Sequence, residues 1–525
     1  MHKISRRKFG KSILSGMVAS ATVAKPSSSK GSVLKKPNIV FICSDQHSGL
    51  MLMGGPGEAV PVRTPNLKRL ASMGVHFKNA YCVDPVCTPG RASLMTGRFA
   101  SDVGSYCNST PFDGRVPTWG GYLRQAGYYT WATGKLDLSP KATMDFTQVQ
   151  TSNGHYEHPD ITSLFRRPMC YRVGERRQVD GKVEQRGKHD QTVLENGLEF
   201  LRTESKGVRK PWAAYMGFIM PHPPFGAPQK YWDMYPPDQM PMPNIPPGYL
   251  ETLPLDFQIL RHFKMISTPI PDERIRRARS AYFGMITELD GMIGQVMDQL
   301  EKMGELENTL FVYTADHGEA LGEHGLWLKN NLLEGAARVP MVVAGAGLPR
   351  GVEIAAPVSH VDLIATLLSL AGMSRPSGLR GHSLLPLLQG NQSAAPPFVY
   401  AESNSEGNCT GSYMIRKGDW KYIYFSWYGD KLLFNLNEDP GEINNLAESP
   451  SHAGKVQELH QLLTSTVDPD AITEAAFGKQ HRVLMEMVQK KTPEEFFNTL
   501  VGRLGRGQAT ALTRKYYPKW QPSPA

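Results

Sequence analysis

Cysteine is scarce in this sequence, with six residues among 525. That number is far too low for a scaffold held together by disulfides. Beyond the N-terminal region there is also no run of 18 uninterrupted apolar residues, the length that a membrane-spanning helix needs. We find no internal repeat. With 40% hydrophobic and 20% charged residues the chain is not disordered as a whole. Its length predicts roughly two to four domains, or one large α/β domain with an appendage.

Acidic residues are absent from the first 36 positions, which contain nine Lys and Arg residues. The whole chain has 58 basic and 49 acidic residues, and its formal charge of +9 by itself suggests a nucleic-acid or membrane-surface partner. The nine N-terminal residues account for all of that surplus, so residues 37–525 contain 49 residues of each sign. This body has no Arg/Lys-rich helix and no aromatic residues interleaved with basic ones. We therefore predict no nucleic-acid partner.

Residues 1–24 have the pattern of a secretory signal, because a basic start precedes an apolar run over 13–24 that contains small residues. The segment Ser-Arg-Arg-Lys-Phe at 5–9 resembles a twin-arginine export signal. The run is too short to span a bilayer, and no Cys follows it for a lipid anchor. A basic amphipathic anchor helix is the alternative. We predict a cleaved signal, a polar linker over 25–36, and a periplasmic or secreted protein without a stable membrane anchor. Because this route exports folded proteins from a reducing compartment, mostly free thiols are expected.

Short β-branched runs alternate with helical patterns over residues 37–396, which predicts an α/β domain with a mainly parallel central sheet flanked by helices. The expected strands lie at 39–42, 128–133, 212–218, 309–314 and 341–344, and the expected helices at 64–73, 189–204, 274–303 and 361–371. Residues 223–272 are rich in Pro and Met and predict a long surface loop. Short strands broken by Gly and Asp then predict a C-terminal subdomain, 397–525, with a small antiparallel sheet and a helix near 456–463.

The segment Cys87-Thr88-Pro89-Gly90-Arg91 is the first with a chemical implication. Pro89 suits a first helical turn, so Cys87 is expected just before a helix N-terminus, whose free N–H groups and dipole attract an anion. Arg91 adds a planar donor that matches a tetrahedral oxyanion. Alone, the segment predicts an anion site with a low-pKa thiol. An ordinary buried Cys, or a disulfide with Cys82, is the alternative.

Through this Cys-x-Pro-x-Arg pattern the chain resembles the sulfatase family, and further motifs extend the resemblance over most of residues 36–450. The resemblance implies an alkaline-phosphatase-like fold and a maturation enzyme that oxidises Cys87 to formylglycine. One hydroxyl of the hydrated aldehyde would attack the sulfate sulfur and expel the alcohol, and deprotonation of the other would release sulfate. This is covalent catalysis with a nucleophile activated by a metal.

Asp45-Gln46 and Asp316-His317 each follow an expected strand, and the carboxyl ends of parallel strands meet at one edge of a sheet. Two carboxylates, an amide oxygen and an imidazole nitrogen suit a divalent cation. Strand-end Asp residues that cap turns are the alternative. By resemblance these four residues and the modified Cys87 hold the metal, although the family's commonest form has Asp-Asp and Asp-Asn here. We expect Ca²⁺, with Mn²⁺ or another divalent cation as the alternative.

The resemblance assigns further residues to the bound sulfate. Lys135 would hold sulfate oxygens as a point charge, and Lys329 matches the family's second sulfate-contacting Lys. Two positions after Lys135 relatives carry a His thought to help deprotonate the hydrated aldehyde. This chain has Asp137, which could act as the base but would be crowded against sulfate. His222, between two prolines at a strand end, would protonate the leaving alcohol or bind the bridging oxygen.

Asn108 lies where some relatives place a polar contact to sulfate or sugar, and a plain turn Asn is the alternative. The loop at 156–177 contains aromatic and Arg residues that suit a sugar subsite or an ordinary exposed loop.

The leading hypothesis is an exported sulfatase that acts on a sulfated carbohydrate. Its closest rival is a phosphonate monoester or phosphodiester hydrolase of the same superfamily, which shares formylglycine and the Asp-Gln and Asp-His pairs. Lys135 favours the sulfatase because those relatives generally lack it. A third possibility is a non-catalytic glycan-binding homologue in which Cys87 stays unmodified.

Overall fold

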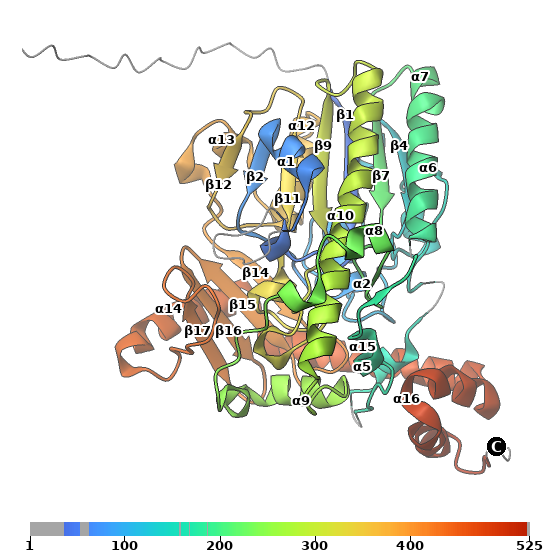
Figure 1. Cartoon of the computed structure of the whole chain (residues 1–525), viewed down its shortest axis with the longest axis vertical. Helices are drawn as coiled ribbons and strands as arrows, with labels where there is room; N and C mark the ends of the chain where they lie inside the picture. Colours follow the sequence, from blue (N-terminus) through green and yellow to red (C-terminus); the bar gives the residue numbers. More distant parts are fainter. Residues whose placement is uncertain (1–35, 53–61, 157–158, 167–168, 186, 522–525) are drawn as a thin grey trace, which may run out of the picture.

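The computed structural model describes residues 36–52, 62–156, 159–166, 169–185 and 187–521 (Figure 1). The predicted signal over 1–24 and nearly all of the predicted linker lie outside these residues. Within the described part of the chain, no helix is both long enough and apolar enough to cross a membrane. All six cysteines are free thiols, so the alternative that pairs Cys87 with Cys82 is wrong.

An eight-stranded, mainly parallel sheet forms the centre of the molecule (Figure 1). Four parallel strands occupy its middle: β9 (Thr309–Ala315), β1 (Asn38–Ser44), β7 (Trp212–Gly217) and β4 (Tyr129–Gly134). The short β5 (Gln148–Val149) extends the β4 edge in parallel. On the other side the antiparallel β11 (Met341–Ala344) joins β9 to β2 (Gly74–Phe77) and β12 (Val352–Ile354). The predicted fold class and strands are confirmed.

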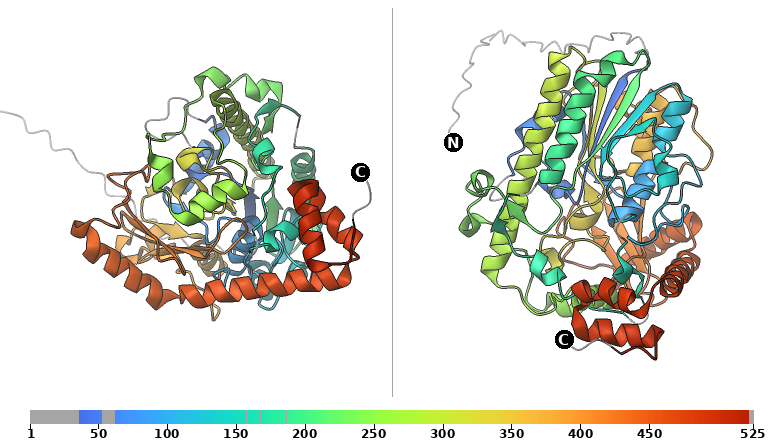
Figure 2. Two further views of the ribbon diagram at one scale, coloured as in Figure 1. Left: turned by 90° about the horizontal axis from the view of Figure 1, so that it is seen from below. Right: turned by 90° about the vertical axis from the view of Figure 1, so that its right-hand side faces the viewer.

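Helices cover both faces of this sheet because its central strands are apolar on both sides. Val40 and Ile42 of β1 pack in one core with α1 (Pro65–Ser72), α6 (Lys188–Arg202) and α10 (Asp272–Lys302). The alternate residues Ile39 and Phe41 pack in a second core with α2 (Cys87–Thr96), α3 (Trp119–Gln125) and α12 (His360–Leu370). Figure 2 (right) shows the two helical layers on either side of the strands.

The prediction of a long surface loop over 223–272 is wrong in part. This segment contains the short β8 (Gly226–Ala227), α8 (Gln229–Trp232) and the nine-residue α9 (Leu255–Phe263). Phe257, Leu260 and Phe263 recur at a spacing that places them on one helix face, and all three are buried. Phe257 meets Phe425 of the C-terminal sheet edge-on at 5.3 Å. The helix is thus stabilised by tertiary packing, which the Pro-rich composition of the segment does not predict.

A second, four-stranded antiparallel sheet follows, as predicted: β14 (Val399–Ser403), β15 (Ser412–Lys417), β16 (Trp420–Phe425) and β17 (Lys431–Asn435). The expected helix is α14 (Ala453–Thr466). Two long helices come after it, α15 (Pro469–Lys490) and α16 (Pro493–Tyr516), each with Pro in its first turn and a side-chain cap, Asp468 or Thr492. Figure 2 (left) shows α15 along one edge of the molecule and α16 folded back beside its end. The sequence analysis did not predict either helix.

A buried ion-pair cluster ties this second sheet to the larger one. Lys421 of β16 lies 3.0 Å from Glu334 and 2.8 Å from Glu442, and all three side chains are almost fully buried. Glu442 also accepts a hydrogen bond of 2.6 Å from the backbone N–H of Glu334. Glu334 begins α11 (Glu334–Ala337), which leads into the strands beside β9. One lysine therefore neutralises carboxylates from both parts of the chain.

We expect Lys421→Ala to lower the free energy of unfolding by about 3–5 kcal/mol, because it leaves the buried Glu442 without its cation and Glu334 with only Arg338 at 3.6 Å. Lys417→Ala is the matched control. Lys417 lies on the same sheet and pairs with Glu458 of α14, but its side chain is 48% exposed. Its loss should cost less than about 1 kcal/mol. Urea unfolding of both variants measures the difference, and equal losses would contradict the role given to the cluster.

Candidate active site

The predicted site residues meet at the carboxyl edge of the central sheet. Asp45 directly follows β1, Asp316 directly follows β9, and Lys135 directly follows β4. Backbone hydrogen bonds continue the strand pairing there, with Asp316 N donating to Ser44 O at 3.1 Å and Lys135 N to Gly217 O at 2.9 Å. Parallel strands that end together bring side chains about 90 to 270 positions apart in sequence to one edge.

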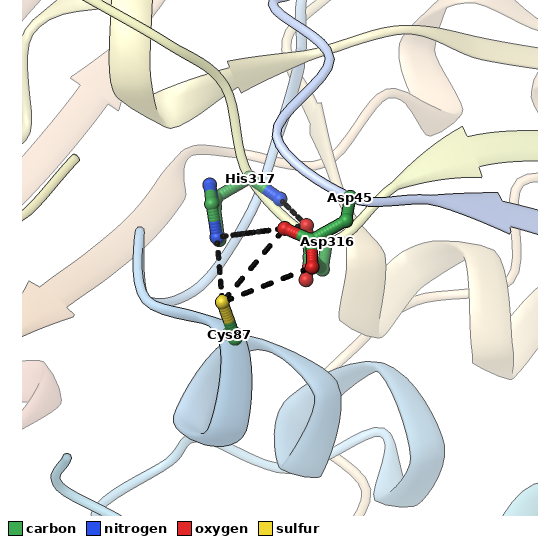
Figure 3. Close-up of side chains that lie close together, drawn as sticks. All are labelled: Asp45, Cys87, Asp316 and His317. Atoms are coloured by element: carbon green, nitrogen blue, oxygen red, sulfur yellow. Dashed lines mark hydrogen bonds and ion pairs between the residues drawn. The ribbon is translucent and has the colours of Figure 1, made fainter. Parts of the chain in front are cut away.

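Asp45, Asp316 and His317 converge on the sulfur of Cys87 (Figure 3). His317 Nε2 lies 3.7 Å from Asp45 Oδ1, 3.6 Å from Asp316 Oδ1 and 3.4 Å from Cys87 Sγ. The other ring nitrogen of His317, Nδ1, is 2.9 Å from the carbonyl oxygen of Gly318. Because that carbonyl can only accept, Nδ1 bears the hydrogen and the lone pair of Nε2 faces the two carboxylates.

Gln46 completes this group of ligands with its amide oxygen. Its backbone is in the left-handed region, with φ of 68°, and its N–H donates to Asp316 Oδ1 at 3.0 Å. Its side-chain Nε2 donates to Glu319, so Oε1 is the end that accepts from Lys329 Nζ, at 2.9 Å. Glu319 is held in turn by the backbone N–H groups of Leu321 and Leu328. The sequence analysis missed Glu319, although it lies two residues after His317.

The donor set fits a divalent cation. Two fully buried carboxylates, one amide oxygen and one imidazole nitrogen with a free lone pair come together, and each has a partner that fixes its orientation. Burial acts to raise the pKa of Asp45, but the charges of Lys135, His222 and Lys329 outweigh it and hold that pKa well below its usual value. Asp45 is therefore an ionised carboxylate at neutral pH.

Cys87 was expected just before a helix N-terminus and is the first residue of α2, and its side chain is fully buried. Gly90 allows this placement, because a Cβ there would lie 2.7 Å from Asp84 O and 3.1 Å from Asp316 O. The sulfur is 2.8 Å from Lys329 Nζ. Burial and Asp45 act to raise the pKa of the thiol. Lys135, Lys329 and a hydrogen bond from His222 outweigh them, so the pKa lies well below its usual value. Cys87 thus lies among cations that stabilise its nucleophilic thiolate form.

Arg91 bridges the strand ends from one turn further along α2. Its Nε donates to Asp316 Oδ2 at 2.9 Å, and its Nη1 donates to Lys135 O at 2.7 Å and to the Tyr215 hydroxyl at 2.8 Å. The guanidinium is fully buried. It therefore fixes the arrangement of β9, β4 and β7 at the site, while its Nη2 has no hydrogen-bond partner and lies 4.0 Å from Asp45 Oδ2. Tyr215, which points inward from β7, was not identified from the sequence.

Lys135 reaches the same centre from β4. Its ammonium group pairs with Asp45 and lies 3.4 Å from Asp137 Oδ2. Asp137 is fully buried, and although burial acts to raise its pKa, the charges of Lys135 and His155 hold it far below its usual range. Asp137 is therefore ionised at neutral pH. Its other oxygen accepts hydrogen bonds from the backbone and ring of His155, a residue that the sequence analysis missed.

His222 follows β7 and is half-buried, with its Nδ1 2.6 Å from the carbonyl oxygen of Pro223. This contact places the hydrogen on Nδ1 and leaves Nε2 for the site. Asn108 lies at the N-terminus of α2, where its Oδ1 accepts from Thr88 N at 3.2 Å and its Nδ2 donates to Glu406 at 3.4 Å. Its observed contacts are those of a helix-capping residue that also joins the C-terminal subdomain.

Comparisons with known proteins agree with this geometry. A family model described as Sulfatase matches residues 37–373, and a model described as N-sulphoglucosamine sulphohydrolase, C-terminal, matches residues 322–468. Choline-sulfatase of Rhizobium meliloti (strain 1021) is 34% identical over 444 residues, which cover 79% of this chain and 83% of that protein. Arylsulfatase K of Danio rerio is 31% identical over 480 residues, which cover 86% and 88%.

Solved structures share the fold. A phosphonate monoester hydrolase from Silicibacter pomeroyi superposes with a TM-score of 0.68 and 26% identity, over 82% of this chain and 95% of that one. The phosphonate monoester hydrolase of Agrobacterium radiobacter has a TM-score of 0.69 and 25% identity, over 82% and 95%.

Proposed function

The chain belongs to the sulfatase family and hydrolyses sulfate esters, and from that premise we propose that it does so through formylglycine at position 87 beside a divalent cation. The observation that carries the proposal is the environment of Cys87. Its side chain is buried at a helix N-terminus, 2.8 Å from Lys329 and 3.4 Å from His317. A formylglycine-generating enzyme is the partner that this maturation requires.

The residues around position 87 suit a sulfate group and an alcohol that leaves from it. Once residue 87 is the hydrated aldehyde, a hydroxyl in place of the thiol supplies the nucleophile. Lys135, Lys329 and the N–H groups at the start of α2 stabilise the negative charge on the sulfate oxygens. His222, in its imidazolium form with Nδ1–H held by the carbonyl oxygen of Pro223, donates the proton of Nε2 to the leaving alcohol oxygen. Arg91 does not touch the sulfate in this scheme; it keeps Asp316 and the Lys135 backbone in place.

Asp45, Gln46, Asp316 and His317 would hold the divalent cation, together with the modified residue 87. When bound, such an ion polarises the sulfate and favours the ionised nucleophile. Three oxygen donors favour Ca²⁺, and the nitrogen of His317 makes Mn²⁺ the alternative. Glu319 acts behind this set by keeping Oε1 of Gln46 turned inward.

We expect Asp316→Asn to lower the bound divalent metal at least about tenfold, because a carboxylate ligand is replaced by an amide and Arg91 loses the carboxylate that orients it. Plasma mass spectrometry of the purified protein gives the metal identity and content. Asp362→Asn is the control, since Asp362 is also buried but caps α12. It should keep the wild-type metal content. A wild-type protein that binds neither Ca²⁺ nor Mn²⁺ after dialysis against both would contradict the site.

Phosphonate monoester hydrolysis is the second candidate, because two solved structures with that activity share the fold. The buried ammonium of Lys135 favours a sulfate ester. We expect the wild-type enzyme, with formylglycine verified by peptide mass at position 87, to hydrolyse an aryl sulfate faster than an aryl phosphonate monoester. Lys135→Ala should lower kcat/KM for the sulfate by about 100-fold or more, since it removes a buried charge that stabilises the transition state. Faster turnover of the phosphonate by the wild type would reverse the assignment.

A sulfated carbohydrate is the substrate class that we propose, with export by the twin-arginine machinery to the periplasm or medium. The support is the match of residues 322–468 to a model named for an N-sulphoglucosamine hydrolase, and the signal-like pattern before residue 25. Choline sulfate is the competing substrate, after the name of one relative.

We expect desulfation of at least one member of a panel of defined sulfated mono- and oligosaccharides at a kcat/KM above that for choline sulfate. The reason is that the Glu406 carboxylate beside Asn108 is paired with Arg172, so it offers an acceptor to hydroxyl groups without the net negative charge that would favour a trimethylammonium group. Ion chromatography of released sulfate measures both. Activity on choline sulfate with none on the panel would overturn the carbohydrate assignment.

A further inference from the structure

Asp137 and His155 form a hydrogen-bonded pair next to position 87. Oδ1 of Asp137 accepts from the backbone N–H of His155 and lies 3.1 Å from its Nδ1. Asp137 is fully buried and the His155 side chain is 20% exposed. A carboxylate oxygen of Asp137, a ring nitrogen of His155 and the sulfur of Cys87 all lie within 4.8 Å of one another.

The backbone builds this pair. The segment over 151–155 runs beside the end of β4, with Gly134 N donating to Thr151 O, and Leu136 N to Asn153 O, both at 3.1 Å. Gly154 then brings the chain against Asp137. A Cβ at Gly154 would lie 2.2 Å from Asp137 Oδ1, and its φ of 154° is one that L-residues rarely adopt. The histidine is therefore placed by strand pairing and a required glycine, not by chance proximity of a surface loop.

His155 is an imidazole that the scheme above leaves unused. His317 is directed at the metal ligands and His222 at the leaving group, whereas His155 approaches position 87 from the β4 side. The charged and titratable groups that face His155 are Asp137, Lys135, Cys87 and Asp160. Since Asp137 engages Nδ1, the lone pair of the ring is on Nε2 when the ring is neutral.

We propose that His155 is the proton acceptor in the release of sulfate from residue 87, and that Asp137 is its positioning residue. The assignment rests on the proposed function. After transfer, the side-chain carbon of residue 87 bears one hydroxyl and one sulfate ester. Nε2 of His155 takes the hydroxyl proton, and the O–H electron pair becomes the second bond of the aldehyde C=O. The C–O bond to sulfate breaks with its electrons, and sulfate leaves as the dianion.

The electrostatics of the pair support this direction of proton transfer. Burial acts to lower the pKa of His155, but the charge of Asp137 and the hydrogen bond to it outweigh burial and raise the pKa above the ordinary value of 6.5. The carboxylate thus stabilises the imidazolium that the step creates, and it cannot itself take the proton because its own pKa lies far too low. The His155–Asp137 pair therefore supplies a proton acceptor, which Asp137 alone could not be.

The test uses the full chain with formylglycine verified at position 87 and a chromogenic aryl sulfate. In His155→Asn the first transfer still occurs, so a burst of phenol equal to the enzyme present should precede a steady-state kcat lowered by about 100-fold or more. Acid quenching during turnover should then give an intact mass increased by one sulfo group. His189→Asn is the matched control, because His189 has the same 3.1 Å contact to an Asp and is 25% exposed. It should behave as the wild type.

A second readout does not depend on turnover. The imidazole pKa of His155, followed by NMR and assigned from the resonance missing in His155→Asn, should lie above 6.5 in the wild type and fall in Asp137→Asn. His155→Gln repeats the kinetic test if the Asn variant fails to fold. Retention of kcat within about threefold, or a lowered kcat without a burst and without the sulfo-enzyme, would overturn the assignment. A wild type that bears formylglycine but turns over no sulfate ester would refute the proposed function. The NMR measurement would then still show whether Asp137 raises the pKa of His155.

Discussion

The buried ion pair between Arg91 and Asp316 is the constraint on which the site depends. Isolated charges of this kind would be prohibitively costly inside a protein, and here each has partners: Arg91 also donates to Lys135 O and Tyr215. Through these contacts one side chain of α2 fixes the ends of three strands. The position of Cys87, one turn earlier on the same helix, follows from that docking.

Charge balance at the sheet edge is local. Residues 37–525 contain equal numbers of acidic and basic residues, so the net charge of this part of the chain does not attract an anion. The carboxylates of Asp45, Asp137 and Asp316 are instead offset by Lys135, Lys329 and Arg91, all nearly inaccessible. Two of these cations, Lys135 and Lys329, also lower the pKa of the Cys87 thiol. The same groups that make the buried carboxylates tolerable make position 87 suitable for an anionic substrate.

The C-terminal subdomain completes the site as well as covering the sheet. Glu406, in the loop after β14, contacts Asn108 and Arg172, and Ser405 accepts from Asn330, the neighbour of Lys329. Lys421 binds carboxylates from both parts of the chain. The loop over 404–411 thus contacts Asn108 at the capped end of α2, and Ser109, the next residue, donates a hydrogen bond to the carbonyl oxygen of Asp160. This is where specificity for the alcohol part of the substrate belongs.

The sequence by itself determined the α/β class, the main strands and the ligand pairs after β1 and β9, because parallel strands must end at one edge and polar residues after apolar runs mark those ends. It also indicated Cys87, since Pro89 suits the first turn of a helix. Only the tertiary structure decided the partners across long separations. It alone showed α9, which is stabilised by distant aromatic contacts, as well as Tyr215 behind Arg91 and Glu319 behind Gln46. His155 lies eighteen positions from Asp137, and no local pattern encodes a contact that depends on strand pairing and on the backbone freedom of Gly154.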